Sequence, residues 1–133
     1  MTNYYFTAPE GLRKLDAPCR DCWIALVDPS EEELRAVSQQ CNVESDVLAA
    51  ALDIDERSRI EVDDHYMMVL TNIPTIEGED EDELYTTIPL SMITTHECIV
   101  TVCSRDTPIL KVFSDGKMRD FFTGMKSRFI LQI

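Results

Sequence analysis

Basic residues and glycines are scarce in this sequence of 133 residues, and each shortage excludes a class of protein. There are 12 Lys and Arg side chains against 25 Asp and Glu, which gives a formal net charge of −13 at pH 7. Such a charge repels phosphate backbones, so we expect no nucleic-acid partner. Only four glycines occur, and none of them lies in a phosphate-binding loop.

Histidine is scarce as well, and this shortage argues against an enzyme. The two histidines, His65 and His96, fall in different predicted turns. Glu97 follows His96, but the second histidine of a zinc protease motif is missing. No serine has the glycine context of a nucleophile elbow. Because a catalytic histidine needs a convergent partner, the sequence predicts that the chain is not an enzyme.

Cysteine is present in an odd number. The five are Cys19, Cys22, Cys41, Cys98 and Cys103. An odd count without a secretory signal argues against a disulfide framework. Cys19 and Cys22 have C-x-x-C spacing, but a zinc ribbon needs a second such pair, and the sequence has none. We therefore expect free, reduced thiols.

Long apolar runs are also missing. A membrane-spanning helix needs about 20 mostly apolar residues, and runs such as 67–70 are far shorter. We expect the chain as given to be soluble. Its length fits one domain, 1–133, and supports a hydrophobic core.

What is present predicts an α/β (α+β) fold with a mixed sheet of about six strands flanked by helices. The run 23–27 is apolar throughout, which is typical of a strand buried on both faces. Pro9, Gly11 and Pro18 predict a loop, and Pro89 indicates an edge or a bulge. The predicted strands are 4–6 (at an edge), 23–27, 59–63, 66–73 (ending at Pro74), 84–95 and 98–102, and the last four form two hairpins.

Four segments have helical patterns. Ser30 and Glu33 have capping-box spacing at the start of a helix that ends near Asn42. Ser45 begins a short second helix, and Thr107 with Pro108 opens a third. From 119 to 133 the apolar residues again recur at helical spacing without a stop signal. We therefore expect the chain to stop inside or just before a longer helix.

Acidic residues gather in two groups, 53–64 and 77–83, and the second group predicts a loop. Neither group has the spacing of an EF-hand loop. A solvated acidic face is the simpler interpretation. The alternative is weak binding of Mg2+, which prefers a few carboxylates and keeps several of its waters.

The order of these segments resembles the N-terminal cytoplasmic domain of the CorA-like family of magnesium and divalent-cation transporters. The sequence WIALVDPSEEEL at 23–34 resembles the family's tryptophan strand and following helix. The likeness covers roughly residues 22 to 122 and rests on the order and spacing of its parts. The other matching segments are 42–48, 52–61, 66–70, 89–93 and 99–102.

The resemblance implies an α/β domain that leads into a long stalk helix. It implies a homopentamer in the full-length protein, with two membrane helices per subunit and a Gly-Met-Asn sequence at the pore mouth. That sequence is absent here, and Gly124-Met125-Lys126 does not replace it. The domain would lie on the cytoplasmic side of the inner membrane and contact the membrane only through C-terminal helices. Its implied work is regulatory: it would couple the level of Mg2+, Co2+, Ni2+ or Zn2+ to the pore.

One departure from the family concerns the metal sensor. The resemblance places an acidic pair after Val47-Leu48, and its aspartate helps to bind a regulatory magnesium between subunits. This sequence has Ala49 and Ala50 there. We expect no tightly bound cofactor, and we take Asp46, Asp53 and Asp55 as candidate ligands for weakly bound Mg2+ or another divalent cation. The alternative function is a stand-alone soluble ligand-sensing or interaction module.

Overall fold

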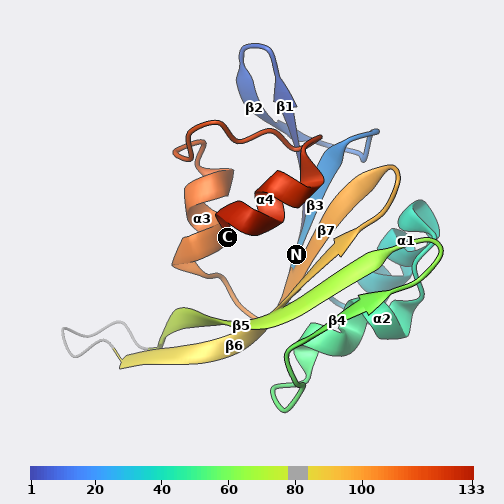
Figure 1. The fold of residues 1–133 in the computed structure, drawn as a ribbon, viewed down its shortest axis with the longest axis vertical. Coiled ribbons are helices and arrows are strands. Elements are labelled where there is room, and N and C mark those ends of the chain that lie inside the picture. The colour runs from blue at the N-terminus through green and yellow to red at the C-terminus, as the bar shows by residue number, and fades with distance from the viewer. Residues whose placement is uncertain (78–83) are drawn as a thin grey trace.

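The computed structural model of the chain describes residues 1–77 and 84–133. Over these residues, seven strands form one mixed sheet in the order β2-β1-β3-β7-β6-β5-β4, with helices on both faces (Figure 1). The predicted α/β class is therefore confirmed. Of the predicted acidic loop 77–83, Glu77 ends a strand, and the rest lies outside the described residues.

The elements follow one another along the chain in this order. The strands are β1 (Thr2–Ala8), β2 (Gly11–Leu15), β3 (Cys22–Val27), β4 (Arg59–Val62), β5 (Met67–Glu77), β6 (Leu84–Thr94) and β7 (Cys98–Cys103). The helices are α1 (Glu31–Cys41), α2 (Ser45–Ala49), the 3-10 turn η1 (Ala50–Leu52), α3 (Pro108–Ser114) and α4 (Lys126–Gln132). Within the described residues, no helix is long and apolar enough to cross a membrane.

The N-terminal hairpin corrects two predictions. The segment predicted as a loop contains β2, which pairs antiparallel with β1. As a result β1 lies between β2 and β3, and β2 is the edge strand. The sequence signal of β2 is weak because Arg13 and Lys14 are exposed and only Leu12 and Leu15 are partly covered. Gly11 has a φ of 130°, which a residue with a side chain rarely adopts.

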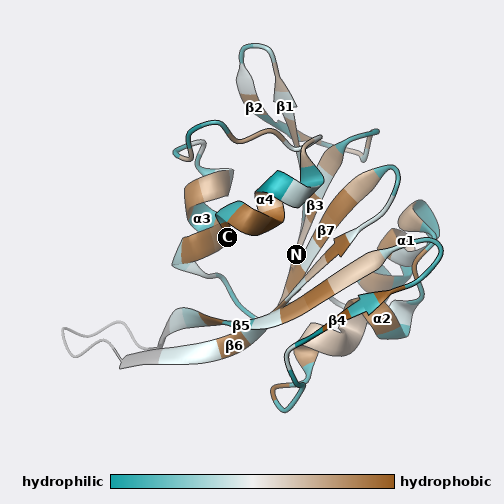
Figure 2. Cartoon of the chain, in the orientation of Figure 1, coloured by the Kyte–Doolittle hydropathy of each residue, from teal (hydrophilic) through white to brown (hydrophobic). Residues whose placement is uncertain are grey.

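The centre of the sheet is the parallel pair β3–β7. Both strands are buried almost throughout, as the apolar run 23–27 predicts. Their side chains alternate between two cores. Ile24 and Leu26 pack beneath α1 and α2, whereas Trp23 and Ala25 pack beneath α3 and α4. Figure 2 shows the hydrophobic residues gathered on these strands and on parts of α3 and α4.

Both predicted hairpins are confirmed. Strand β4 turns into β5 with Asp63 N donating to Tyr66 O at 2.9 Å, and Thr95 N donates to Cys98 O at 2.9 Å between β6 and β7. One boundary is wrong, because β5 continues through Pro74. Among the described residues, 71–77 of β5 and 84–89 of β6 pair only with each other. Pro74 and Pro89 lie in that stretch, where the outer edges are open and tolerate proline.

Helix α1 forms as its sequence predicts. The Ser30 hydroxyl accepts from Glu33 N at 3.2 Å, and the Glu33 carboxylate accepts from Ser30 N at 3.1 Å. Asn42 ends the helix in the left-handed conformation, with a φ of 55°. The predicted second helix covers 45–52, but its last turn tightens into the 3-10 turn η1.

The C-terminal segment corrects the prediction of a helix from Arg119. Helix α4 begins only at Lys126. Residues 119–125 are irregular, and Thr123 N donates to Thr7 Oγ1 of β1 at 3.0 Å while Thr7 N donates to Thr123 Oγ1 at 3.2 Å. This tertiary pairing replaces the intrahelical bonds that the apolar spacing alone would favour.

An aromatic cluster explains the apolar spacing of that segment. Phe121 and Phe129 are buried, and their ring centroids lie 4.5 Å apart. Trp23 contacts both rings edge-on, and its Nε1 donates to Thr101 Oγ1 at 2.8 Å. Phe113 from α3 completes the cluster. The apolar positions therefore reflect contacts with one core rather than one continuous helix.

We predict that Glu33→Gln lowers the free energy of unfolding by about 1 kcal/mol at pH 7. Hydrogen bonds from the Thr2 hydroxyl and from Ser30 N hold the pKa of Glu33 at about 2. Because folding lowers the pKa of Glu33, the ionised carboxylate stabilises the folded chain fully above its ordinary pKa near 4.5. This stabilisation is lost as the pH falls toward 2. Urea unfolding of wild type and variant at several pH values measures the difference. Glu32→Gln, exposed in the same turn, is the control and should have little effect.

We predict that Phe129→Ala destabilises the fold by about 3–5 kcal/mol, because the ring is fully buried in the aromatic cluster. Phe122→Ala is the matched control. That ring is 47% exposed, and its loss should cost about 0.5 kcal/mol. Chemical denaturation of both variants tests whether α4 packs into the core through Phe129. Equal losses of stability in the two variants would contradict the burial of Phe129 in the aromatic cluster.

Candidate functional site

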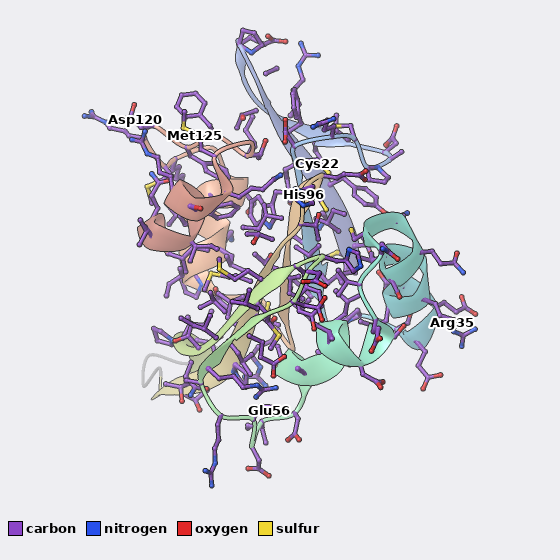
Figure 3. All side chains as sticks on the ribbon, turned by 45° about the vertical axis from the view of Figure 1, so that its right-hand side comes forward. Cys22, Arg35, Glu56, His96, Asp120 and Met125 are labelled. Atoms are coloured by element: carbon purple, nitrogen blue, oxygen red, sulfur yellow. The ribbon has the colours of Figure 1, made fainter. Side chains whose placement is uncertain are left out.

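The short helix α2, η1 and the loop that leads to β4 border a shallow, open acidic hollow of about 340 Å3. Figure 3 labels Glu56 in that loop. The acidic hollow takes its charged lining from α2, the loop and β4, and its apolar lining from α2, η1 and β5. Its lining residues are Asp46, Val47, Ala49, Ala50, Asp53, Glu56, Arg59, Glu61 and Met68.

Arg59 organises the charges on one side of the acidic hollow. Its Nε donates to Glu61 Oε1 at 2.7 Å, and a second guanidinium nitrogen donates to Glu56. These bonds, first that to Glu61 and then that to Glu56, raise the pKa of the guanidinium. Asp46 and Asp53 lie on the same lining, and neither forms an ion pair within the described part of the chain. The lining therefore carries more negative than positive charge.

The structure brings together two of the three predicted metal ligands. Asp46 and Asp53 line the acidic hollow, whereas Asp55 is exposed outside its lining and donates its backbone N–H to Asp53 Oδ1 at 3.0 Å. Among the described residues, no three His, Cys, Asp or Glu side chains are placed to hold a metal ion together. The acidic hollow therefore suits a hydrated cation, held through water and charge, better than a directly coordinated one.

Ala49 and Ala50 lie half-buried in the same lining. They are the positions at which the sequence resemblance places an acidic pair. Their methyl groups supply no ligand, and the nearest acids of the lining are on α2 and in the following loop. The structure thus places the two alanines in the lining of the acidic hollow, beside acids from other positions.

The two histidines come together in a way that the sequence did not reveal. His65 and His96 line one hollow of about 330 Å3, because the β4–β5 and β6–β7 turns lie at the same end of the sheet. Both side chains are exposed. Lys126 of α4 closes this end by donating from Nζ to the carbonyls of Thr95 and His96 at 3.1 and 3.0 Å.

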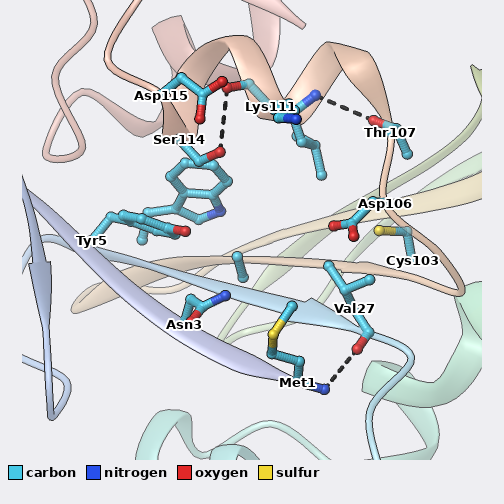
Figure 4. A pocket seen from close by; sticks show the side chains of 13 residues that line it. Met1, Asn3, Tyr5, Val27, Cys103, Asp106, Thr107, Lys111, Ser114 and Asp115 are labelled. Atoms are coloured by element: carbon cyan, nitrogen blue, oxygen red, sulfur yellow. Dashed lines mark hydrogen bonds between the residues drawn. The ribbon is translucent and has the colours of Figure 1, made fainter.

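A third hollow, of about 240 Å3, lies between β1 and α3 (Figure 4). Tyr5, Asp106 and Lys111 supply its polar lining, with Cys103 among its apolar neighbours. Burial raises the pKa of the Cys103 thiol to about 11 and also raises that of Tyr5. At pH 7 both groups are therefore protonated, and neither the Cys103 thiol nor the Tyr5 hydroxyl is an activated nucleophile.

Comparisons with known proteins agree on one family. The family model described as "CorA-like Mg2+ transporter protein" matches residues 21–127. The soluble domain of CorA from Methanocaldococcus jannaschii has a TM-score of 0.74 and 24% identity, and the match covers 98% of this chain and 52% of that one. The complete CorA magnesium transporter from the same organism has a TM-score of 0.70 and 24% identity, over 92% of this chain and 39% of that one.

A more distant structure has the same fold. The ZntB cytoplasmic domain from Vibrio parahaemolyticus has a TM-score of 0.56 and 11% identity, covering 86% of this chain and 50% of that one. The chain thus spans between 39% and 52% of these structures' own lengths. No curated protein matches the chain significantly.

We predict that Lys126→Met destabilises the chain by about 1–2 kcal/mol, because two backbone carbonyls lose a charged donor whose side chain is only 15% exposed. Thermal and urea unfolding measure the loss. Lys117→Met, at an exposed lysine, is the control. If both variants unfold alike, Lys126 does not hold α4 against the β6–β7 turn.

Proposed function

Since the chain belongs to the CorA-like Mg2+ transporter family, we propose that it is the cytoplasmic regulatory and scaffolding domain of a transporter for Mg2+ or another divalent cation. The observation that carries the proposal is the family match over residues 21–127. The fold shared with the CorA soluble domain supports it. In this proposal the domain is not an enzyme, and the ion crosses the membrane through other parts of the longer protein.

The charge of the chain supports a cation as the regulatory ligand. A net charge of −13 raises the local concentration of cations around the surface. The acidic hollow focuses part of that field where Asp46 and Asp53 lie together. A hydrated divalent cation would dock there through its waters, with Arg59 limiting the negative charge.

Self-association would allow a cation bound to this domain to influence the pore of the transporter. Copies of the chain that each carry a net charge of −13 repel one another. A cation between two acidic faces offsets that repulsion. The cation can shift the assembly only by its differential affinity for the open and closed arrangements. We therefore propose that the full-length protein is a homo-oligomer, a pentamer as the family resemblance implies, anchored on the cytoplasmic side of the membrane.

A second candidate is a stand-alone soluble module that senses a small ligand. Two observations favour it: the hollow between β1 and α3, and the replacement of the expected acidic pair by Ala49 and Ala50. Uptake of divalent cations by cells that carry the full-length protein separates the two functions. Metal-dependent uptake that a deletion of this domain deregulates supports transport. Unchanged uptake favours the module.

We predict that the chain binds Mg2+ weakly at the acidic hollow and that Asp46→Asn or Asp53→Asn each weakens binding by roughly fivefold. Isothermal titration calorimetry at low ionic strength measures the affinity, since salt screens exposed charges. Asp64→Asn, in the β4–β5 turn outside this lining, is the control with the same loss of charge.

Arg59→Gln provides a test of opposite sign. Removing the guanidinium frees the carboxylates of Glu56 and Glu61, so Mg2+ should bind more tightly in this variant. The same affinity in all variants would contradict a site in the acidic hollow. It would leave the family assignment unaffected, because that rests on the sequence match.

A further inference from the structure

Four of the five cysteines, drawn from three separate parts of the sequence, line one hollow of about 310 Å3. Cys19 is exposed, whereas the other three are buried. Cys22 and Cys98 are direct partners in the parallel register of β3 and β7. Cys41, the last residue of α1, reaches the same place from the helical layer. Only Cys19 and Cys22 are near each other in the sequence, and the fold brings Cys41 and Cys98 to them.

One pair within this group is in contact. The Sγ atoms of Cys41 and Cys98 lie 3.2 Å apart, although 57 positions separate them in the chain. The cysteines are unbonded, and these two thiols are 8% and 3% exposed as whole residues. Both nevertheless line the hollow, whose rim carries the exposed Arg20 and Gln40. A small molecule that enters the hollow can therefore reach them.

The surroundings make the two thiols unequal. A hydrogen bond joins the two thiols, and either sulfur can be its donor. With Cys41 as the donor, this bond lowers the pKa of the Cys98 thiol; the Thr95 hydroxyl, 3.5 Å from Cys98 Sγ, and the charge of Lys126 act in the same direction against burial. The bond to Cys98 and burial raise the pKa of Cys41. By contrast, burial raises the pKa of Cys22 to about 11. Cys98 is thus the thiol best able to act as a nucleophile.

We propose that Cys41 and Cys98 form an oxidation site that a small hydroperoxide converts reversibly into a disulfide between α1 and β7. The contact between the sulfur atoms carries this proposal. A metal site is less favoured, because among the described side chains no three ligands are placed to hold an ion. The proposal does not depend on the transport function.

The chemistry balances with the hydroperoxide as the oxidant. The Cys98 thiolate attacks the peroxide oxygen and the O–O bond breaks, which leaves a sulfenic acid on Cys98. The departing alkoxide or hydroxide takes up the proton that the Cys98 thiol had released and leaves as an alcohol or water. The Cys41 sulfur then attacks the Cys98 sulfur. The S–O bond breaks, and the departing hydroxide takes the Cys41 proton and leaves as water. Two thiols lose two electrons to the peroxide, and a dithiol reductant reverses the change by thiol exchange.

The disulfide would fix the end of α1 to the central sheet. Asn42 and α2 follow directly, so the corner that contains the acidic hollow would be held more rigidly. The bond would also restrict the unfolded chain over the 57 positions between the two cysteines. We expect oxidation to raise the melting temperature by roughly 10 °C, and a dithiol reductant to restore the original value.

The experiment treats the folded chain with hydrogen peroxide and then alkylates it under denaturing conditions. We expect two of the five thiols to become protected, without added oxygen mass, and peptide mapping should recover one Cys41–Cys98 link. Recovery of five free thiols, of sulfinic or sulfonic acids without a link, or of a link through Cys19 or Cys22 would overturn the proposal. A lowered melting temperature after oxidation would also overturn it.

Matched variants complete the test. Cys103→Ser removes a buried thiol that lies outside this hollow and should still form the link, as should Cys19→Ser at the rim. Cys98→Ser should lose both the link and the shift in melting temperature. If Cys98→Ser folds poorly, peptide mapping of the wild-type chain still tests the proposal. Stoichiometric binding of added Zn2+ that shields all four thiols from peroxide would show a soft-metal site instead and would overturn the proposal.

Discussion

The parallel contact between β3 and β7 is the constraint on which the rest of this structure depends. These strands are buried on both faces, so each must be covered twice, by α1 and α2 on one side and by α3 and α4 on the other. Parallel strands need a long crossover between them, and the chain uses that crossover to build α1, α2 and the β4–β5–β6 meander. Each hollow discussed above lies beside one of the covering layers.

Most of the charged side chains lie outside the two cores of this framework. The core positions are apolar, and the net charge of −13 is therefore carried mostly at the surface and in loops. At the acidic hollow, Arg59 bonds two carboxylates and keeps the local charge from accumulating further. At the opposite end of β4, Lys126 donates to two backbone carbonyls and also lies 3.5 Å from Asp21 Oδ1. Arg59 thus acts locally, within its own strand and the preceding loop, whereas Lys126 joins α4 to the β6–β7 turn. The exposed acids that remain are available to solvent cations.

Sequence reasoning succeeded where a local rule decides the structure. The capping box at Ser30 and the left-handed Asn42 bound α1, and the two hairpins follow from alternating strands beside short polar turns. It failed where tertiary contacts override spacing. Strand β2 has little apolar signal and forms because β1 offers it an edge, and residues 119–125 leave the helical pattern because Thr123 pairs with Thr7 of β1. Of the candidate ligands, Asp46 and Asp53 share a hollow and Asp55 does not line it.

The sequence by itself determined the fold class, the family and the buried central strand, because apolar runs, caps and the order of segments are written along the chain. Only the tertiary structure decided which distant side chains meet. The separation of 57 positions between Cys41 and Cys98 gives no hint of a 3.2 Å contact, and two separate turns bring His65 and His96, 31 positions apart, to one hollow. Such meetings depend on strand order and on how helices pack across the sheet. Local propensity does not encode either of these.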